Sequence, residues 1–153
     1  MKSAENGAEL REKKGLAYYI RAGASNYKDT GVFQVSAGVQ VSKLEQAVKV
    51  IQDELQKISS ELVGAKELLK AKEYIKGKTV LALEDNQVRL DWYLEQIAFK
   101  KDIETPDLSF KKVDAVTPKQ IKNLAKALIN KNKMTLAVIG PYKNLKSINK
   151  LVK

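Results

Sequence analysis

Two stretches near the start of the chain alternate between apolar and polar positions, a pattern typical of half-buried β-strands. In residues 18–25 one face carries Tyr18, Ile20, Ala22 and Ala24, and the other carries Tyr19, Arg21, Gly23 and Ser25. In residues 32–41 one face carries Phe33, Val35, Ala37, Val39 and Val41. Residues 26–31 between them are rich in turn formers, so the pattern predicts an antiparallel hairpin with a loop of about six residues.

Further along, the apolar positions recur at three- and four-residue spacing, which predicts helices over about 43–60, 65–83 and 85–100. Ser42 and Glu45 form a capping-box pattern that predicts the start of the first helix. Trp92, in the third, is interpreted as a core anchor rather than a platform for a ligand. Thr117 as cap and Pro118 at the first helical position predict one more helix.

A continuous apolar run at residues 134–139, closed by Gly140 and Pro141, predicts a late, buried strand. The predicted fold class is α+β: a small antiparallel or mixed sheet, made of the hairpin plus the late strand, with helices packed on one face. Three strands are few for so many helices. We therefore expect that a segment is missing at the N-terminus, or that another chain completes the sheet.

Composition narrows the possible classes of function. The chain has 153 residues, enough for one domain, and no apolar stretch long enough to cross a membrane. Residues 1–10 contain no apolar core of a signal peptide, so we expect a soluble, cytoplasmic protein without a membrane partner. The sequence contains no cysteine and no histidine, which excludes disulfides, thiol catalysis, imidazole bases and the usual zinc sites.

The net charge of +10 is concentrated in the last third of the chain. Residues 110–153 carry 11 lysines and one acid, Asp114, whereas the basic and acidic residues before them balance. Such an asymmetry can indicate binding to nucleic acid. However, Arg11, Arg21 and Arg89 are the only arginines, and no nucleic-acid motif is present. We favour solvated lysines and regard nucleic acid as an unlikely partner.

The most informative local feature is a corner at residues 10–20, where a charged helix end breaks at Gly15 and leads into the first strand. Arg11 and Tyr18 lie seven residues apart across this corner. A guanidinium with five donors and a phenolic hydroxyl can together grip a peptide carbonyl or carboxylate. The alternative is structural: Arg11 caps a helix C-terminus and Tyr18 lies in the interior.

Several blocks, in this order, resemble the insulinase, pitrilysin and mitochondrial-processing-peptidase family of zinc peptidases. The resemblance covers about residues 9–142 and rests on Leu10-Arg11-Glu12-Lys13-Lys14-Gly15-Leu16-Ala17-Tyr18, Asp29-Thr30-Gly31, the helix at 43–60, Lys76-Gly77 before Leu83-Glu84-Asp85, Val113-Asp114-Ala115-Val116-Thr117, and Leu136-Ala137-Val138-Ile139-Gly140-Pro141.

This resemblance implies an α+β module that closes with a second module around a peptide. In that family one module carries a His-x-x-Glu-His zinc site, and this chain, without histidine, cannot be that half. The resemblance gives Arg11 and Tyr18 the roles of holding a peptide carbonyl and donating to the developing oxyanion. It implies no cofactor in this chain, zinc in a partner module in cis or in a separate subunit, and a peptide substrate.

The front of the chain departs from the family pattern, because residues 1–8 look like an unrelated, disordered tag or remnant. We therefore expect an N-terminally truncated module at 9–142, a short amphipathic basic tail at 143–153, and an exposed sheet edge that favours a homodimer. The leading hypothesis is a non-catalytic, substrate-binding C-terminal module of a zinc metalloendopeptidase, inert alone. The alternatives are an inactive scaffold or assembly subunit of the same fold and, more weakly, a basic nucleic-acid-binding domain.

Overall fold

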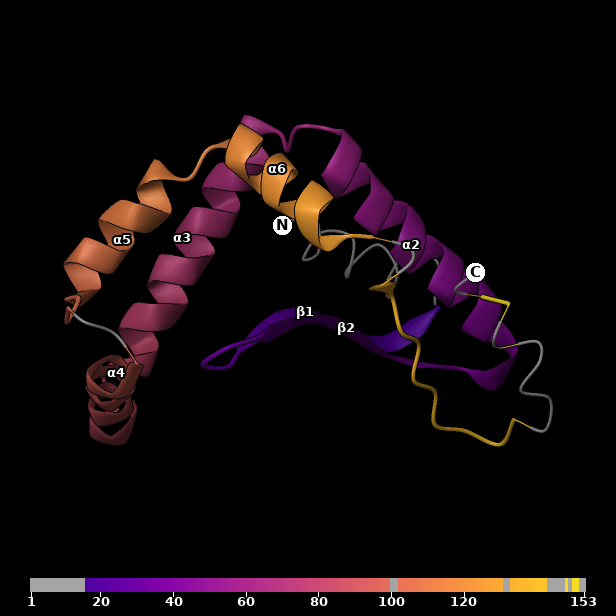
Figure 1. The fold of residues 1–153 in the computed structure, drawn as a ribbon, viewed down its shortest axis with the longest axis horizontal. Helices are drawn as coiled ribbons and strands as arrows, with labels where there is room; N and C mark the ends of the chain where they lie inside the picture. Colours follow the sequence, from indigo (N-terminus) through magenta and orange to yellow (C-terminus); the bar gives the residue numbers. More distant parts are fainter. Residues whose placement is uncertain (1–15, 100–101, 131–132, 143–147, 149, 152–153) are drawn as a thin grey trace. The chain divides into compact units, whose positions relative to one another are not determined.

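The computed structural model describes residues 16–99, 102–130, 133–142, 148 and 150–151. Its architecture is the mixed α+β fold that the sequence predicts (Figure 1). The elements are, in chain order, β1 (Ala17–Asn26), β2 (Gly31–Val39), the short 3-10 helix η2 (Val41–Lys43), α2 (Leu44–Ser60), α3 (Ala65–Ala82), α4 (Asn86–Phe99), α5 (Pro106–Ala115) and α6 (Pro118–Leu128).

The chain divides into two compact units. Unit 1 comprises residues 1–63 and 119–153, and unit 2 comprises residues 64–118. The expected disordered segment at 1–8, and most of the expected basic tail at 143–153, lie outside the described residues.

Unit 1 is built on the antiparallel β1–β2 hairpin. Asn26 pairs with Gly31, so the loop has four residues rather than the six expected, and Tyr27 N donates to Thr30 O at 2.8 Å. The register places the apolar side chains of both strands on one face in the pairs Ile20–Ala37, Ala22–Val35 and Ala24–Phe33. Ile20, Val35 and Ala37 on this face are half-buried, whereas Ala22, Ala24 and Phe33, nearer the loop, are exposed. The segregation is that of a sheet with one face toward a core, and the burial is confined to the end of the hairpin away from the loop.

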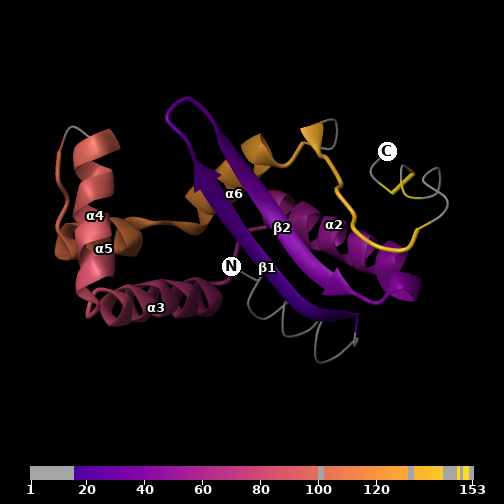
Figure 2. The same cartoon turned by 90° about the horizontal axis from the view of Figure 1, so that it is seen from below.

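Helices α2 and α6 lie on one side of the hairpin, and the view from below shows the two strands in front of both helices (Figures 1 and 2). The prediction that helices pack on one face is thus confirmed for unit 1. Among the described residues of this unit, the buried apolar side chains are Leu16, Ala17, Leu44, Ala47, Val63 and Ala125. In the middle of α2, Gln52 Nε2 donates to the carbonyl oxygen of Leu151 at 2.7 Å.

Unit 2 contains α3, α4 and α5, and lysines of α3 join the first of these helices to the last. Lys72 Nζ donates to the backbone oxygen of Asp114 at 2.6 Å, and Lys76 Nζ lies 3.0 Å from Asp114 Oδ1 and 2.8 Å from Glu73 Oε1. The hydrogen bonds to Glu73 and then to Asp114 raise the pKa of Lys76. On the basic side, Lys76 therefore keeps its charge, and with it these ion pairs, until the pH rises above the usual lysine range.

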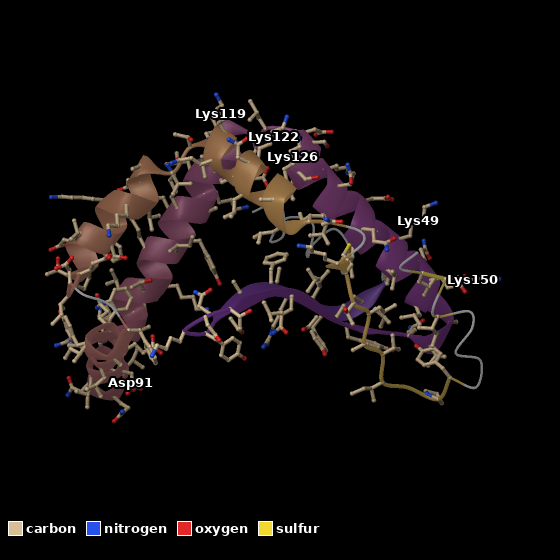
Figure 3. All side chains as sticks on the ribbon, viewed as in Figure 1. Lys49, Asp91, Lys119, Lys122, Lys126 and Lys150 are labelled. Carbon is tan, nitrogen blue, oxygen red and sulfur yellow. The ribbon has the colours of Figure 1, made fainter. Side chains whose placement is uncertain are left out.

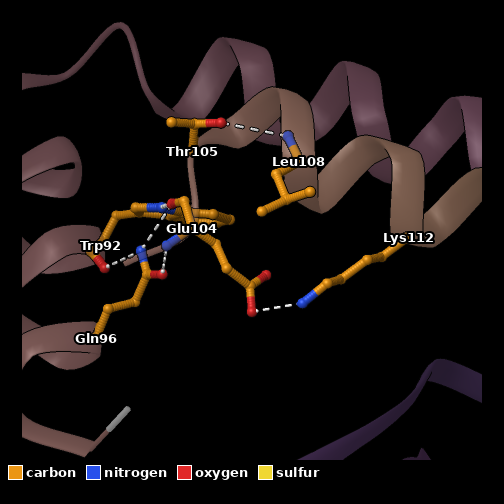
Figure 4. Close-up of polar contacts among 6 residues, drawn as sticks. All are labelled: Trp92, Gln96, Glu104, Thr105, Leu108 and Lys112. Carbon is orange, nitrogen blue, oxygen red and sulfur yellow. Dashed lines mark hydrogen bonds and ion pairs between the residues drawn. The ribbon is translucent and has the colours of Figure 1, made fainter. Parts of the chain in front are cut away.

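A polar joint connects α4 to the segment that enters α5 (Figure 4). Gln96 is 4% exposed; its Nε2 donates to Trp92 O at 3.1 Å and to Glu104 O at 3.2 Å, and its Oε1 accepts from Glu104 N at 2.7 Å. The indole Nε1 of Trp92 also donates to Glu104 O, at 3.5 Å. One amide side chain thus satisfies both backbone groups of Glu104 in a part-buried position.

Helix α5 was not predicted from the sequence, although its start signal is present. Thr105 is the N-cap and accepts from Leu108 N at 3.3 Å, and Pro106 is the first helical residue. This is the same Thr-Pro signature that correctly predicts α6 at Thr117 and Pro118. The sequence interpretation missed α5 because the helix has ten residues, fewer than the window of about 11–18 residues over which a helical period becomes clear.

Two further predictions about local structure are wrong. Residues 134–139 do not form a strand: they have no strand pairing, although Met134, Leu136 and Val138 are half-buried and alternate with exposed residues. An apolar run can become a strand only beside a hydrogen-bonding neighbour, and the described residues offer none there. The capping box at Ser42 and Glu45 is also not formed. Ser42 lies within η2, and the N-cap of α2 is Lys43, which makes no side-chain cap bond.

The joint at Gln96 gives a prediction about stability. We expect Gln96→Ala to lower the free energy of unfolding by about 1–3 kcal/mol, because the backbone N–H and carbonyl of Glu104 would lose their partner in a part-buried position. The single tryptophan, Trp92, lies at this joint, so urea denaturation followed by its fluorescence reports the change. The matched control is Gln87→Ala, which removes an exposed amide bonded to Asp91 and should change stability by less than about 0.5 kcal/mol. Equal denaturation midpoints for the two variants would contradict the prediction.

Candidate functional site

Of the two residues singled out in the sequence, the structure describes Tyr18, and Arg11 lies outside the described residues. Tyr18 is 69% exposed, which does not fit the alternative of an interior tyrosine. It directly follows Leu16 and Ala17, which are 2% and 9% exposed. The phenol therefore projects from the start of a strand whose first residue, Ala17, is buried together with the preceding Leu16.

The pairing of the strands is irregular at Tyr18. Ala17 pairs with Val39 and Tyr19 pairs with Gly38, which leaves Tyr18 as the extra residue of a β-bulge. Bulges bend a strand locally and redirect a side chain. The strict alternation that grouped Tyr18 with Ile20 therefore fails at this residue, whereas from Tyr19 onward the two faces are as predicted.

A second group of polar side chains lies on the hairpin face opposite the apolar pairs. Tyr19 and Arg21 of β1 and Gln34 and Ser36 of β2 line an open hollow of about 580 Å³, together with Ala22 and Gly23. The register pairs Arg21 directly with Ser36 and Gly23 with Gln34. Alternation groups Tyr19 with Arg21 in the sequence, but only the register shows which residues of β2 join them.

The aromatic ring of Tyr19 lies over the backbone of its partner, Gly38. A Cβ atom built on Gly38 would come within 2.5 Å of the Tyr19 ring atom Cε1, closer than real contacts allow. The absence of a side chain at Gly38 thus permits this position of the ring. The ring forms one end of the polar hollow.

The chemistry of these residues does not fit a metal centre. The sequence contains no histidine and no cysteine, and the described residues include no group of three or more acidic side chains that could hold an ion. Zinc prefers nitrogen and sulfur ligands supported by carboxylates. The site can donate hydrogen bonds and one permanent positive charge, but it supplies no ligand set for zinc.

The lysine surplus of the last third of the chain lies partly on one face of α6. Lys119, Lys122 and Lys126 follow one another along this helix, on the side that points away from the hairpin, and Lys49 projects from α2 (Figure 3). Among the described residues of α6 there is no acidic side chain. This arrangement is typical of a solvated outer face of an amphipathic helix.

None of the helices among the described residues is both long and apolar enough to cross a membrane.

The chain is similar in sequence to a peptidase-family domain and to several zinc proteases. The family described as Peptidase M16 inactive domain matches residues 7–75, which include Arg11, Tyr18 and both strands. An uncharacterized zinc protease of Streptomyces coelicolor is 29% identical over 137 residues, which are 89% of this chain and 29% of that protein. A zinc protease of Bacillus subtilis, also uncharacterized, is 29% identical over 91% of this chain and 34% of its own length.

Two further similarities extend beyond bacteria. A probable mitochondrial-processing peptidase subunit beta of Arabidopsis thaliana is 26% identical over 94% of this chain and 28% of its own length. A chain of complex III2 from Candida albicans matches in structure with a TM-score of 0.71 and 16% identity, over 78% of this chain and 29% of that one. That likeness shows the fold alone. The chain spans about a third of the length of the curated relatives it matches.

The lysine face of α6 allows the weakest of the hypotheses, nucleic-acid binding, to be tested. We expect no measurable binding of the full chain to duplex DNA at 150 mM salt, because lysines without arginine forks or a reading motif give only weak contacts to phosphates. Fluorescence anisotropy over a salt series measures this. A slope of log K against log salt near −3, falling to near −2 in Lys122→Gln, would contradict the expectation.

Proposed function

The chain belongs to the insulinase, or M16, family of zinc peptidases, and we propose that it is a substrate-binding module of such a peptidase without catalytic chemistry of its own. The observation that carries the proposal is the match of residues 7–75 to the inactive domain of the family. The residue types point the same way, because a chain without histidine or cysteine lacks the ligands of a catalytic zinc.

Arg11 and Tyr18 are the residues proposed to contact the peptide. Tyr18 supports its role by position: its phenol is exposed, while the two residues before it are buried. A donor that is held in place before the reaction stabilises a developing oxyanion better than a mobile one, because little reorganisation is needed. Arg11, seven residues earlier in the sequence, is proposed to hold a neighbouring backbone carbonyl of the peptide.

The zinc is proposed to come from a partner module carrying a His-x-x-Glu-His site, either in the same polypeptide or in a second subunit. Proteins named as zinc proteases are about three times as long as this chain. Exposed apolar side chains also support a partner. Leu90, Leu94 and Ile97 recur along one stripe of α4 and are 52%, 50% and 62% exposed. Pairing at the outer edges of the hairpin, by that module or by a second copy of this chain, belongs to the same proposal.

The alternative within the same fold is an inactive scaffold or assembly subunit, in which Arg11 and Tyr18 are structural. The exposure of Tyr18 favours contact with a ligand over a structural role for that residue. Mutation of the pair in the assembled peptidase separates the two possibilities.

For the assembled peptidase, we expect Tyr18→Phe to lower kcat by about 10²-fold, because loss of one oxyanion donor typically costs this much. Arg11→Ala should mainly raise KM, because a contact to a carbonyl away from the reacting bond binds ground state and transition state alike. Steady-state cleavage of a fluorogenic peptide by this chain mixed with the zinc-bearing module measures both constants.

Tyr27→Phe is the matched control for Tyr18→Phe. Tyr27 is also an exposed hairpin tyrosine, 64% exposed, but it lies in the loop. Its variant should leave kcat and KM unchanged. If Tyr18→Phe and Arg11→Ala turn over peptide as the wild type does, the scaffold hypothesis replaces substrate contact.

A second prediction concerns the metal. The purified chain should hydrolyse no peptide and retain only substoichiometric zinc after dialysis, because it offers no nitrogen or sulfur ligand set. A chelator should abolish cleavage by the mixture of modules and leave the circular dichroism of this chain unchanged. Elemental analysis and the peptide assay check these outcomes; chelator-sensitive hydrolysis by the chain alone would refute the proposal.

A further inference from the structure

The hollow on the outer face of the β1–β2 hairpin has a chemistry that the roles of Arg11 and Tyr18 do not explain. Its polar side chains, from Tyr19, Arg21, Gln34 and Ser36, can all donate hydrogen bonds, and only Arg21 is charged. No acidic residue lines it. Among the described residues, Arg21 forms no ion pair, so its guanidinium is available to a ligand.

The contrast with Arg89 shows what a structural arginine does in this chain. The Nε and Nη2 atoms of Arg89 donate to the carbonyl oxygen of Leu83 at 3.0 and 2.7 Å. Leu83 is the C-cap of α3, so Arg89 caps the C-terminal end of this helix. Arg21 has no such acceptor in the described structure and lies in a strand, in the middle of the hollow. The surplus positive charge elsewhere in the chain is carried by lysine.

The two glycines of this face shape the hollow. Gly23 pairs with Gln34, and a Cβ built on it would meet nothing within 4 Å, so the floor beside Arg21 is open. Gly38 lets the ring of Tyr19 lie over the backbone and form the opposite end. The hollow of about 580 Å³ is open to solvent, so it can receive one side chain of a bound segment but does not enclose a whole ligand.

We propose that this hollow is a subsite for the carboxylate side chain of an extended peptide, an aspartate or a glutamate. The planar fork of Arg21 suits a carboxylate, which accepts two parallel hydrogen bonds, and the amide of Gln34 and the hydroxyl of Ser36 are positioned as additional donors. A phosphate dianion is a poorer fit, because the hollow offers one cation and neither a glycine-rich loop nor a helix N-terminus.

The outer edges of the hairpin offer a place for the backbone of the bound peptide. The described sheet contains two strands, so each has an outer edge whose backbone groups can pair with an extended segment. A side chain of such a segment would project onto the sheet face that carries Arg21. The biological meaning of this subsite, selection of acidic residues in a substrate, rests on the proposed function, but its ligand chemistry does not.

The test measures binding of peptides to the full chain, without the zinc-bearing module. The probes are fluorescently labelled, acetylated and amidated pentapeptides of alanine with either Glu or Gln at the centre, and an all-alanine peptide with a free C-terminal carboxylate. Fluorescence anisotropy should show about tenfold tighter binding of the Glu peptide than of the Gln peptide, the scale of a hydrogen bond to a charged group.

Arg21→Gln should abolish that preference, and the matched control Lys28→Gln, which removes one positive charge from the loop of the same hairpin, should keep it. Gly38→Ala changes no charge but displaces the Tyr19 ring, and should weaken binding of the Glu peptide. Circular dichroism checks that each variant is folded.

Equal affinities for the Glu and Gln peptides, or no binding of either, would overturn the proposal. A preference that survives Arg21→Gln, or that is lost equally in Lys28→Gln, would also overturn it. If the all-alanine peptide with a free C-terminal carboxylate binds most tightly, the proposal is also wrong, because the hollow then binds the end of a peptide chain and not an acidic side chain.

Failure of this subsite and failure of the proposed function give different results. If Arg11→Ala and Tyr18→Phe leave turnover unchanged while Arg21→Gln abolishes the peptide preference, the subsite stands and the proposed role of the pair falls. If both hold, Arg21→Gln in the assembled peptidase should raise KM about tenfold for a Glu substrate and leave kcat unchanged.

Discussion

The register of β1 against β2 decides which side chains of the hairpin meet the helices and which face outward. Since side chains alternate along a strand, a slip of one residue would turn Arg21 toward the helices and expose Ile20. Two constraints hold the register. At one end, Leu16 and Ala17 are buried; at the other, the four-residue turn is closed by the bond from Tyr27 N to Thr30 O. Between these two ends β1 has one residue more than β2, and the bulge at Tyr18 accommodates it.

In unit 2, polar contacts join three helices that bury few apolar side chains. Leu68, Leu83 and Gln96 are its buried side chains among the described residues. Gln96 satisfies both backbone groups of Glu104 and thereby fixes the approach to α5, while Lys72 and Lys76 connect α3 to the other end of α5. Removing one partner from such a part-buried pair costs more than the bond contributes, because the remaining group stays desolvated.

The parts of the fold that sequence could predict are those set by local periodicity. The hairpin, α2, α3, α4 and α6 all follow from alternation or from apolar stripes, and α6 also from its Thr-Pro start. The parts that failed did so for two reasons. Residues 134–139 carry the pattern of a strand, but pairing requires a second strand beside them. Helix α5 has a local start signal, Thr105 and Pro106, but its ten residues are too few for a clear helical period.

The residues of the candidate site also differ in whether the sequence alone could predict them. The corner that carries Arg11 and Tyr18 is visible in the sequence because its spacing is local, whereas the hollow around Arg21 requires the register of a second strand. Charge acts at two ranges here. The net charge of +10 attracts anionic ligands over about one Debye length, roughly 8 Å at physiological salt, without selecting among them. Selection needs a planar donor at contact distance, and arginine provides it where lysine would not. Lys119, Lys122 and Lys126 lie on the outer face of α6, while Arg21 lies among hydrogen-bond donors on a strand pair, and this difference agrees with the proposed division between attraction and recognition.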